Sequence, residues 1–270
     1  MPELPEVETS RRGIAPYVVG QRIDEIVIRE RRLRWPVSMD VDQRLPGQTV
    51  TTVDRRAKYL LVHTTDGTAI IHLGMSGSIH IVRHDTPAGV HDHFDIVFGS
   101  GNSLRFRDPR RFGSLHWTDD VAEHWLIRNL GPEPLGDTFS GKYLWTKSRG
   151  RRVSIKQFIM NANIVVGVGN IYSSEALFLA GIHPRRAAGR IAAHRYDALV
   201  AAIKLVLQNA IAAGGTTLRD YFGGDGQPGY FQQQLEVYGR DGQPCRRCKR
   251  PVSVMVIGQR STFYCKRCQT

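Results

Sequence analysis

The first six residues, MPELPE, combine residue types that can do covalent chemistry. Removal of Met1 would leave Pro2 with a free secondary amine, with Glu3 and Glu6 within one helical turn of it. A positioned amine beside carboxylates can attack a sugar carbon, because the amine is a nucleophile and a carboxyl group can supply a proton. The alternative is that the segment only starts a helix, with Pro5 in the first turn and the carboxylates as favourable charges at the amino end.

The four cysteines of the chain form a second chemical motif, with the spacing Cys-x2-Cys-x16-Cys-x2-Cys: Cys245, Cys248, Cys265 and Cys268. Pairs of thiolates at this spacing form two knuckles that complete a tetrahedral zinc site. Two disulfides are the alternative, and they are rare in a reducing cytoplasm. Because four protein ligands leave no position open for a substrate, we expect one structural Zn2+. Arg260 would lie at the tip of a β-hairpin between the knuckles.

A glycine-rich turn, residues 166–169, precedes Asn170 and a predicted helix over 170–178. Free backbone N–H groups at such a helix start can hold a phosphate, and Asn170 can cap the helix or donate a hydrogen bond to an oxygen atom. A plain helix start is the alternative. The turn is not GxGxxG and follows no βαβ pattern, so no dinucleotide site is predicted.

Three further side chains lie where predicted strands turn: Met75, Arg110 and Phe112. A thioether, a guanidinium and an aromatic ring that project from one edge of a sheet can fill the space left when a base is extruded from a duplex. Burial in the core is the alternative for Met75 and Phe112. Lys58 enters a predicted strand, and an exposed surface charge is the simplest interpretation of it.

Short alternating segments in the first half of the chain predict an antiparallel β-sandwich or barrel that would position these residues. The predicted strands cover residues 22–28, 50–63, 68–73, 78–83, 94–98 and 103–107. Helices are predicted over residues 9–18, from Thr118 through Leu126, and over 195–212, where apolar residues recur every three or four positions. The glycine-rich segment 214–229 predicts a long loop.

The composition favours a polyanionic partner. The chain has 270 residues, 41% of them apolar, which is enough for two ordinary domains, and it carries a formal net charge of +12 with a pI of 9.9. Seven basic residues and a single acid fall in residues 241–270. There is no run of about 18 apolar residues and no basic, apolar signal at the amino end. We therefore expect a cytoplasmic protein with no membrane association.

Together, these motifs resemble the bacterial formamidopyrimidine-DNA glycosylase family, also called MutM or DNA-(apurinic or apyrimidinic site) lyase. The resemblance agrees in motif order and spans nearly the whole chain, over residues 1–8, 55–61, 72–78, 108–113, 129–135, 167–178, 215–238 and the cysteine motif. It implies an α+β fold: an N-terminal antiparallel β-sandwich with flanking helices, a helix-two-turns-helix domain and a C-terminal zinc-finger β-hairpin. The implied domains cover residues 1–130, 131–235, with a lesion-recognition loop at 214–229, and 236–270.

The resemblance also implies roles for individual residues. Pro2 resembles the nucleophile that attacks C1′ of the damaged nucleotide and forms a Schiff base, and Glu3 the acid that protonates the sugar ring oxygen, with Glu6 in support. Lys58 resembles the proton donor of β-elimination, and Arg260 that of δ-elimination. Further residues match family positions that contact DNA or fill the space left by the extruded nucleotide, here called void-filling positions: His91, Arg110, Arg151, Asn170, Met75 and Phe112.

Two positions depart from the family pattern. Asn161 stands where many relatives carry Asp, and Arg219, in the lesion-recognition loop, stands where Lys is common.

The function implied by the resemblance is excision of oxidised purines, chiefly 8-oxoguanine and formamidopyrimidines, from damaged double-stranded DNA. The resemblance implies a monomer with a structural Zn2+ and no organic cofactor, working in the cytoplasm at the nucleoid. Two alternatives stay open: an endonuclease VIII-type enzyme that acts on oxidised pyrimidines, and a non-catalytic zinc-finger protein that only binds distorted DNA.

Overall fold

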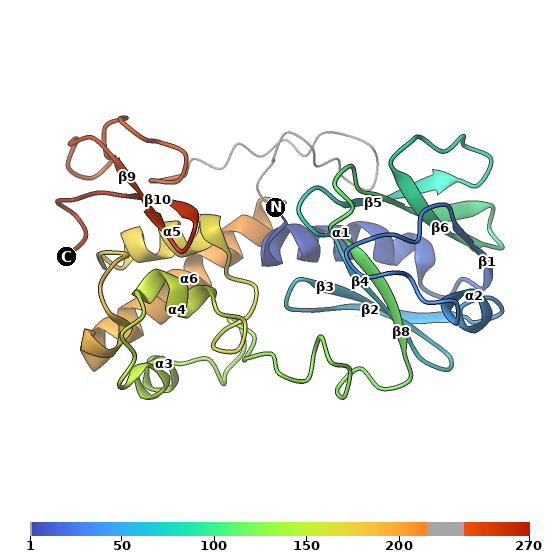
Figure 1. Cartoon of the computed structure of the whole chain (residues 1–270), viewed down its shortest axis with the longest axis horizontal. Helices are drawn as coiled ribbons and strands as arrows, with labels where there is room; N and C mark the ends of the chain where they lie inside the picture. Colours follow the sequence, from blue (N-terminus) through green and yellow to red (C-terminus); the bar gives the residue numbers. More distant parts are fainter. Residues whose placement is uncertain (1, 215–234) are drawn as a thin grey trace. The chain divides into compact units, whose positions relative to one another are not determined.

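The alternating segments of the first half form eight strands in two antiparallel sheets. The strands are β1 (Ile23–Ile28), β2 (Val50–Arg56), β3 (Tyr59–Thr64), β4 (Thr68–His72), β5 (Ser78–Arg83), β6 (Asp92–Phe98), β7 (Asn102–Arg107) and β8 (Ser114–Thr118). One sheet has the order β1-β6-β7-β5 and the other β2-β3-β4-β8 (Figure 1). The predicted β-sandwich is thus confirmed.

The computed structural model describes residues 2–214 and 235–270. These residues divide into two units: 2–128 with 213–214, and 129–212 with 235–270. The predicted loop over 214–229, with Arg219, lies outside the described residues except for Gly214. The division into three domains stays a prediction.

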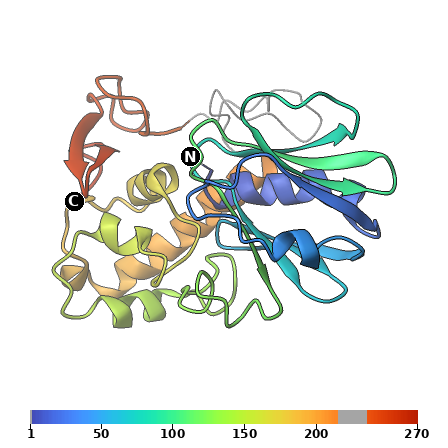
Figure 2. The same cartoon turned by 45° about the vertical axis from the view of Figure 1, so that its right-hand side comes forward.

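Helix α1 (Leu4–Val18) packs inside the sandwich, with one sheet on each side of it (Figures 1 and 2). Val7 and Ile14 of this helix share a buried core with Phe94 of one sheet and Ile71 of the other. The predicted helix over 9–18 begins five residues too late, because a capping box starts the helix directly after Glu3. A short helix, α2 (Val41–Arg44), adjoins the sandwich.

The strand region predicted over 50–63 consists of two strands, β2 and β3. The chain reverses direction between β2 and β3, so that Arg56 pairs with Tyr59 across a two-residue turn. Ala57 takes a positive φ of 56° there, a conformation usually left to glycine or asparagine. The turn therefore carries no residue that would mark it in the sequence.

The predicted helix from Thr118 through Leu126 is also wrong. Thr118 is the last residue of β8 and pairs with Thr68 of β4. The following residues form turns in which Asp120 Oδ1 accepts a hydrogen bond from the Ala122 N–H at 2.8 Å. Local bonds of Asp side chains compete with helical ones, and here they prevail.

The second unit is mainly helical, and its elements are α3 (Gly141–Ser148), α4 (Ile155–Met160), α5 (Asn170–Leu179), the 3-10 helix η1 (Ala188–Arg190), α6 (Ala193–Ala212), β9 (Ser253–Ile257) and β10 (Arg260–Tyr264). The predicted apolar stripe of α6 is confirmed as core, since Leu199, Ile203 and Leu207 are buried. β9 and β10 form the predicted hairpin. No helix within residues 2–214 and 235–270 is long and apolar enough to cross a bilayer.

Candidate functional site

The amino end of α1 gathers the residues predicted to do covalent chemistry. Glu3 is the N-cap of the helix: its N–H donates to Glu6 Oε2 at 2.8 Å, and its side chain accepts from the Glu6 N–H. Both carboxylates are only 1% exposed, and Pro2 is buried as well. The positive end of the helix dipole stabilises carboxylates at this position. The capping box therefore fixes the peptide that follows Pro2. The same residues can both start the helix and hold the Pro2 amine for chemistry, so the two interpretations of MPELPE are compatible.

The turn that carries Lys58 is tied to α1 by an ion pair. Glu8 of α1 accepts a hydrogen bond from Arg55 of β2 at 3.3 Å, and Arg55 donates to the Ala57 carbonyl at 3.0 Å. Burial alone would raise the pKa of Glu8, but hydrogen bonds from two further arginines, at 2.9 and 2.8 Å, hold it below its usual value. Glu8 thus stays anionic and fixes the Lys58 turn against the helix.

His72, at the end of β4, is a site residue that the sequence analysis missed. Its Nδ1 accepts a hydrogen bond from the Gly74 N–H at 3.0 Å, and its ring centroid lies 5.0 Å from that of Tyr59. Burial, followed by the positive charges of Lys58 and Arg34, lowers the pKa of His72 to about 4. The imidazole is therefore neutral at pH 7 and holds the turn that leads to Met75.

Asp108 joins two loops at the edge of the sandwich. The carboxylate is fully buried, and it accepts hydrogen bonds from Ser76 Oγ at 2.6 Å, from the Arg110 N–H at 3.2 Å and from the Gly113 N–H at 2.8 Å. A buried carboxylate with several charge-assisted bonds is a strong local constraint. Asp108 therefore holds the loop around Met75 against the loop over 109–113.

These two loops present the three predicted void-filling side chains. Met75 and Phe112 are 38% and 41% exposed, so the core alternative for them is wrong. The Arg110 guanidinium carbon lies 4.9 Å from the centroid of the Phe112 ring. Gly74 has a φ of 69°, and a Cβ there would overlap the backbone of Phe112 and Gly113. Glycine at position 74 thus permits close contact between the loop that carries Met75 and the loop that carries Arg110 and Phe112.

His91 lines a pocket of about 530 Å³ beside these loops, together with Arg29, Pro109 and Arg111. The His91 carbonyl accepts a hydrogen bond from the Asp108 N–H at 3.0 Å. Asp108 thus binds both predicted DNA-contact residues: its N–H donates to the His91 carbonyl, and its carboxylate accepts from the Arg110 N–H.

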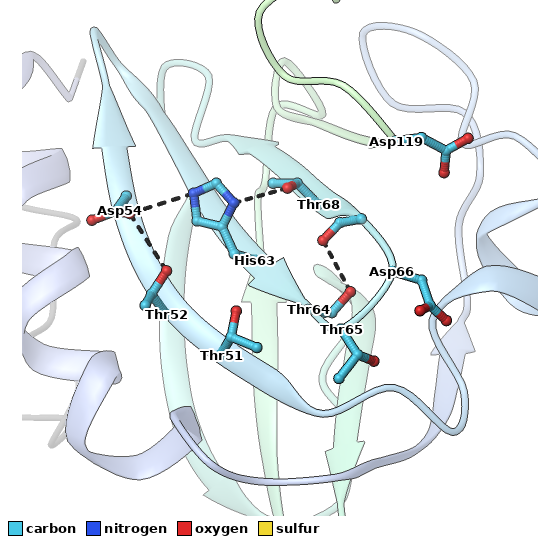
Figure 3. A pocket seen from close by; sticks show the side chains of 10 residues that line it. Thr51, Thr52, Asp54, His63, Thr64, Thr65, Asp66, Thr68 and Asp119 are labelled. Atoms are coloured by element: carbon cyan, nitrogen blue, oxygen red, sulfur yellow. Dashed lines mark hydrogen bonds and ion pairs between the residues drawn. The ribbon is translucent and has the colours of Figure 1, made fainter.

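A second depression, of about 520 Å³, lies on the outer face of the other sheet (Figure 3). His63 bridges it, with Nδ1 2.9 Å from Thr68 Oγ1 and Nε2 3.4 Å from Asp54 Oδ2. Asp66 and Asp119 also line it, so its carboxylates would repel a polyanion. It is not part of the candidate DNA site.

In the second unit, Asn170 binds the hairpin that carries Arg260. Asn170 is the first residue of α5, and its Nδ2 donates to the Ser261 carbonyl at 3.1 Å. Lys156 of α4 is 1% exposed, and its Nζ donates to the same carbonyl at 3.4 Å and to Thr262 Oγ1 at 2.8 Å. Arg260 precedes these residues on β10 and is exposed. Gly169, and not Asn170, is the N-cap of α5, and the Asn170 side chain binds the hairpin.

Glu175 of α5 fixes the segment that enters the zinc finger. Its carboxylate accepts hydrogen bonds from three backbone N–H groups, those of Glu236 at 2.7 Å, Val237 at 3.0 Å and Tyr238 at 2.8 Å. Burial raises the pKa of Glu175, and these three bonds oppose that rise. The sequence analysis missed this residue, because nothing in its spacing reveals a partner 61 residues away.

The four cysteine sulphur atoms lie within 4.8 Å of one another, with none in a disulfide. Cys245 and Cys268 Sγ are 3.9 Å apart, and Cys248 and Cys265 Sγ are 3.4 Å apart. A tetrahedral zinc with bonds of about 2.3 Å needs sulphur atoms separated by about 3.8 Å. The residues therefore fit the predicted structural Zn2+, which they would hold with no ligand position left open.

Family models match the chain in three successive segments. "Formamidopyrimidine-DNA glycosylase N-terminal domain" matches residues 1–115, "Formamidopyrimidine-DNA glycosylase H2TH domain" matches residues 130–221, and "Zinc finger found in FPG and IleRS" matches residues 242–270. The chain belongs to the formamidopyrimidine-DNA glycosylase family. The predicted resemblance and the fold class that it implied are thus confirmed.

Relatives named formamidopyrimidine-DNA glycosylase match the full chain. Those from Pseudomonas paraeruginosa and Nitrosococcus oceani are 58% and 57% identical, with 100% of both chains covered. Among solved structures, MutM (Fpg) from Thermus thermophilus is 36% identical, covers 99% of this chain and 98% of its own, and has a TM-score of 0.89. Wild-type Lactococcus lactis Fpg in complex with DNA containing N7-benzyl-Fapy-dG is 34% identical, covers 100% of both chains and has a TM-score of 0.91.

Three residues noted in the sequence remain: Arg151, Asn161 and Arg219. Arg151 is exposed on the turn between α3 and α4. Asn161, the departure noted in the sequence, is the C-cap of α4, and its Oδ1 accepts from the Asn163 N–H at 2.9 Å. Arg219 lies outside the described residues. The roles of the individual site residues therefore stay predictions.

Proposed function

We propose that this chain is a DNA glycosylase of base-excision repair that removes oxidised purines, among them 8-oxoguanine and formamidopyrimidines, and then cleaves the strand as a lyase. The observation that carries this proposal is the capping box at the start of α1, which fixes Pro2 next to the buried carboxylates of Glu3 and Glu6. Family membership supplies the substrate class, since the relatives are formamidopyrimidine-DNA glycosylases.

In the first step, the Pro2 nitrogen attacks C1′ of the damaged nucleotide, and the bond from C1′ to the base breaks. The departing base takes up the proton that the Pro2 nitrogen loses. Glu3 donates a proton to the sugar ring oxygen, so the ring opens and an iminium forms between Pro2 and C1′. An α-amine has an ordinary pKa of about 7.7–8.0, and the positive end of the helix dipole favours its neutral form. The reactive amine is therefore available near pH 7 once Met1 has been removed.

The iminium withdraws electrons from C2′, so a C2′ proton can leave and the 3′ phosphate is expelled in β-elimination. Lys58 serves as the proton donor of this step. A second elimination, assisted by Arg260, expels the 5′ phosphate. Water then adds to C1′ of the iminium, the bond from C1′ to the Pro2 nitrogen breaks, and the remaining unsaturated aldehyde leaves. The product is a gap of a single nucleotide with a phosphate at each end.

Several residues hold the DNA while this chemistry proceeds. His91, Arg110, Arg151 and Asn170 contact the strand, with Asn170 at the phosphate beside the lesion. Met75, Arg110 and Phe112 fill the space of the extruded nucleotide, whose unstacking costs a few kcal/mol. The exposed Met75 and Phe112 and the contact between Arg110 and Phe112 support this assignment. Arg219 contributes to base preference from the lesion-recognition loop.

Damaged double-stranded DNA is the proposed partner, and Lactococcus lactis Fpg has been solved with DNA containing an abasic site, at 34% identity and a TM-score of 0.90. The enzyme works as a monomer at the nucleoid in the cytoplasm, with no organic cofactor. Zinc supplies no chemistry in this scheme and stabilises the hairpin that carries Arg260.

Covalent trapping tests the nucleophile. Borohydride reduces an iminium to a stable amine, so the full chain should be trapped on duplex DNA that contains 8-oxoguanine. Pro2→Gly should lower the rate of strand cleavage at least about 100-fold, as expected for loss of a positioned nucleophile, while binding to an abasic-site analogue is retained. Pro16→Gly, an exposed proline of the same helix, is the matched control. Unchanged trapping of the Pro2 variant would disprove the assignment.

The same assay separates the alternatives. Strong preference for thymine glycol over 8-oxoguanine would favour an endonuclease VIII-type enzyme. Binding without any trapped adduct would favour a non-catalytic DNA-binding protein.

A further inference from the structure

Several exposed arginines of the first unit form ion pairs with acidic neighbours. In the first unit, Arg22, Arg32 and Arg83 each bind a nearby carboxylate, at 3.3, 2.8 and 3.3 Å. Their charges are therefore largely neutralised by acidic neighbours. In the second unit, one group of arginines forms no ion pair with any carboxylate of residues 2–214 and 235–270, and it occupies two adjoining segments.

This group, called the arginine cluster below, consists of five exposed residues: Arg151, Arg152, Arg185, Arg186 and Arg190. Its two segments are joined by backbone hydrogen bonds. The Ile155 N–H donates to the Arg186 carbonyl at 2.7 Å, the Ala188 N–H to the Val153 carbonyl at 2.9 Å, and the Gly189 N–H to the Arg151 carbonyl at 2.9 Å. The arginines therefore stand on a fixed double segment.

Close packing keeps the two segments in register. A Cβ at Gly189 would lie 2.8 Å from the Arg151 carbonyl oxygen, so only glycine permits this approach. The Tyr196 hydroxyl of α6 donates to the Ala188 carbonyl at 2.9 Å and anchors the second segment to the helical core. Five positive charges are thus held near one another despite their mutual repulsion.

Within residues 2–214 and 235–270, no carboxylate lies at ion-pair distance from any member of the arginine cluster. The positive charge of the cluster also affects the pKa values of two neighbouring side chains. Burial and then Arg185 lower the pKa of His183, while burial and then Arg186 lower that of Arg195. An exposed positive surface without counter-charges is suited to a polyanion.

We propose that four further arginines extend the DNA contact of Arg151 into a phosphate-binding surface for duplex DNA that does not depend on a lesion: Arg152, Arg185, Arg186 and Arg190. This surface works in addition to Asn170 and Arg260. The proposal rests on the proposed function and extends it from the damaged nucleotide to the flanking backbone. Guanidinium groups bind phosphate oxygens in a bidentate manner, without reading the bases. The surface therefore serves to hold undamaged duplex during the search.

α4 connects this surface to the residues that are predicted to act at the lesion. Its first residue, Ile155, bonds to the cluster, and its second, Lys156, bonds to Ser261 and Thr262 next to Arg260. One short helix therefore spans from the arginine cluster to the hairpin that carries Arg260.

The test compares two triple variants with the same change of charge. Arg152→Ala/Arg185→Ala/Arg190→Ala removes part of the cluster, and Arg22→Ala/Arg32→Ala/Arg83→Ala removes ion-paired arginines. Binding to undamaged duplex and to the same duplex with a tetrahydrofuran abasic analogue is measured over a series of NaCl concentrations. Each lost phosphate contact lowers the slope of log K against log salt by about 0.9. The cluster variant should lose up to about 2.7 in slope on both duplexes.

The control variant should lose less than about 1 in slope, because its arginines act only through net charge. Arg152→Lys/Arg185→Lys/Arg190→Lys should recover most of the slope, since charge is kept. Equal slopes for the two alanine variants, or a loss confined to the abasic duplex, would overturn the inference. Failure of the proposed function is a separate result, namely wild-type protein that forms no borohydride adduct while its salt dependence stays steep.

Discussion

Protonation of His72 should weaken the fold below pH 6.5. The pKa of this buried imidazole drops from 6.5 to about 4 on folding. As pH falls through 6.5 the unfolded chain takes up the proton first, so the contribution of His72 to stability is fully present above pH 6.5 and is lost as pH approaches 4. The difference of 2.5 units corresponds to about 3.4 kcal/mol at full effect, at about 1.36 kcal/mol per unit.

At pH 5 the same linkage amounts to about 2 kcal/mol. His72 is half-buried as a whole residue, so screening by solvent reduces this, and we expect about 1–2 kcal/mol. Urea unfolding followed by tryptophan fluorescence at pH 7.5, 6 and 5 measures it. His72→Gln should lose less stability than wild type over this range, by about that amount.

His84→Gln, at an exposed position, is the control and should follow the wild-type pH dependence. Parallel stability curves for the wild type and His72→Gln would refute the argument, because they would show that the imidazole takes up its proton equally in the folded and unfolded chains.

Two further predictions concern the buried Asp108 carboxylate and the four cysteines. Asp108→Asn replaces an acceptor that binds three groups, so we expect about 1–3 kcal/mol less stability and weaker binding to abasic duplex, while an unchanged melting temperature would contradict this role. Intact-mass measurement under native conditions should find one zinc per chain. A strong chelator should remove the zinc, and DNA binding should be lost with it. DNA binding that survives complete loss of zinc would contradict a structural role for the metal.

Patterns that repeat locally were predictable from the sequence. The strand β5 has the predicted bounds, and the cysteine spacing predicted both the zinc ligands and the hairpin between them. The apolar period of α6 identified its buried face. In each case the information lies within a few residues along the chain, so a single sequence contains it.

Features that depend on distant partners were not predictable. The sequence around Ala57 looks like the interior of a strand. The positive φ of Ala57 is stabilised by a hydrogen bond from Arg55 to its carbonyl, and Arg55 is held by the distant Glu8. Asp108 and Glu175 look like ordinary acids, and Lys156 like a surface charge in a helix. Their burial and their hydrogen bonds arise only when separate segments meet, which no local period records.

The void-filling residues lie between these cases. The sequence placed Met75 and Phe112 correctly at strand ends, where their exposure follows from the loops. What it lacked was the device that joins the loops, namely the Asp108 carboxylate together with the glycine at position 74.

The bonds around the zinc finger determine what can be inherited or exchanged as a piece. Glu175 holds the segment that leads into the finger, Lys156 and Asn170 hold its hairpin, and Gln269 donates to the Ile182 carbonyl at 2.9 Å. Sequence similarity marks the finger as residues 242–270. A finger transplanted from a relative at that boundary would keep the partners of Glu175, but it would leave the buried Lys156 of α4 and Asn170 of α5 facing a foreign hairpin. The smallest exchangeable piece therefore includes these helices.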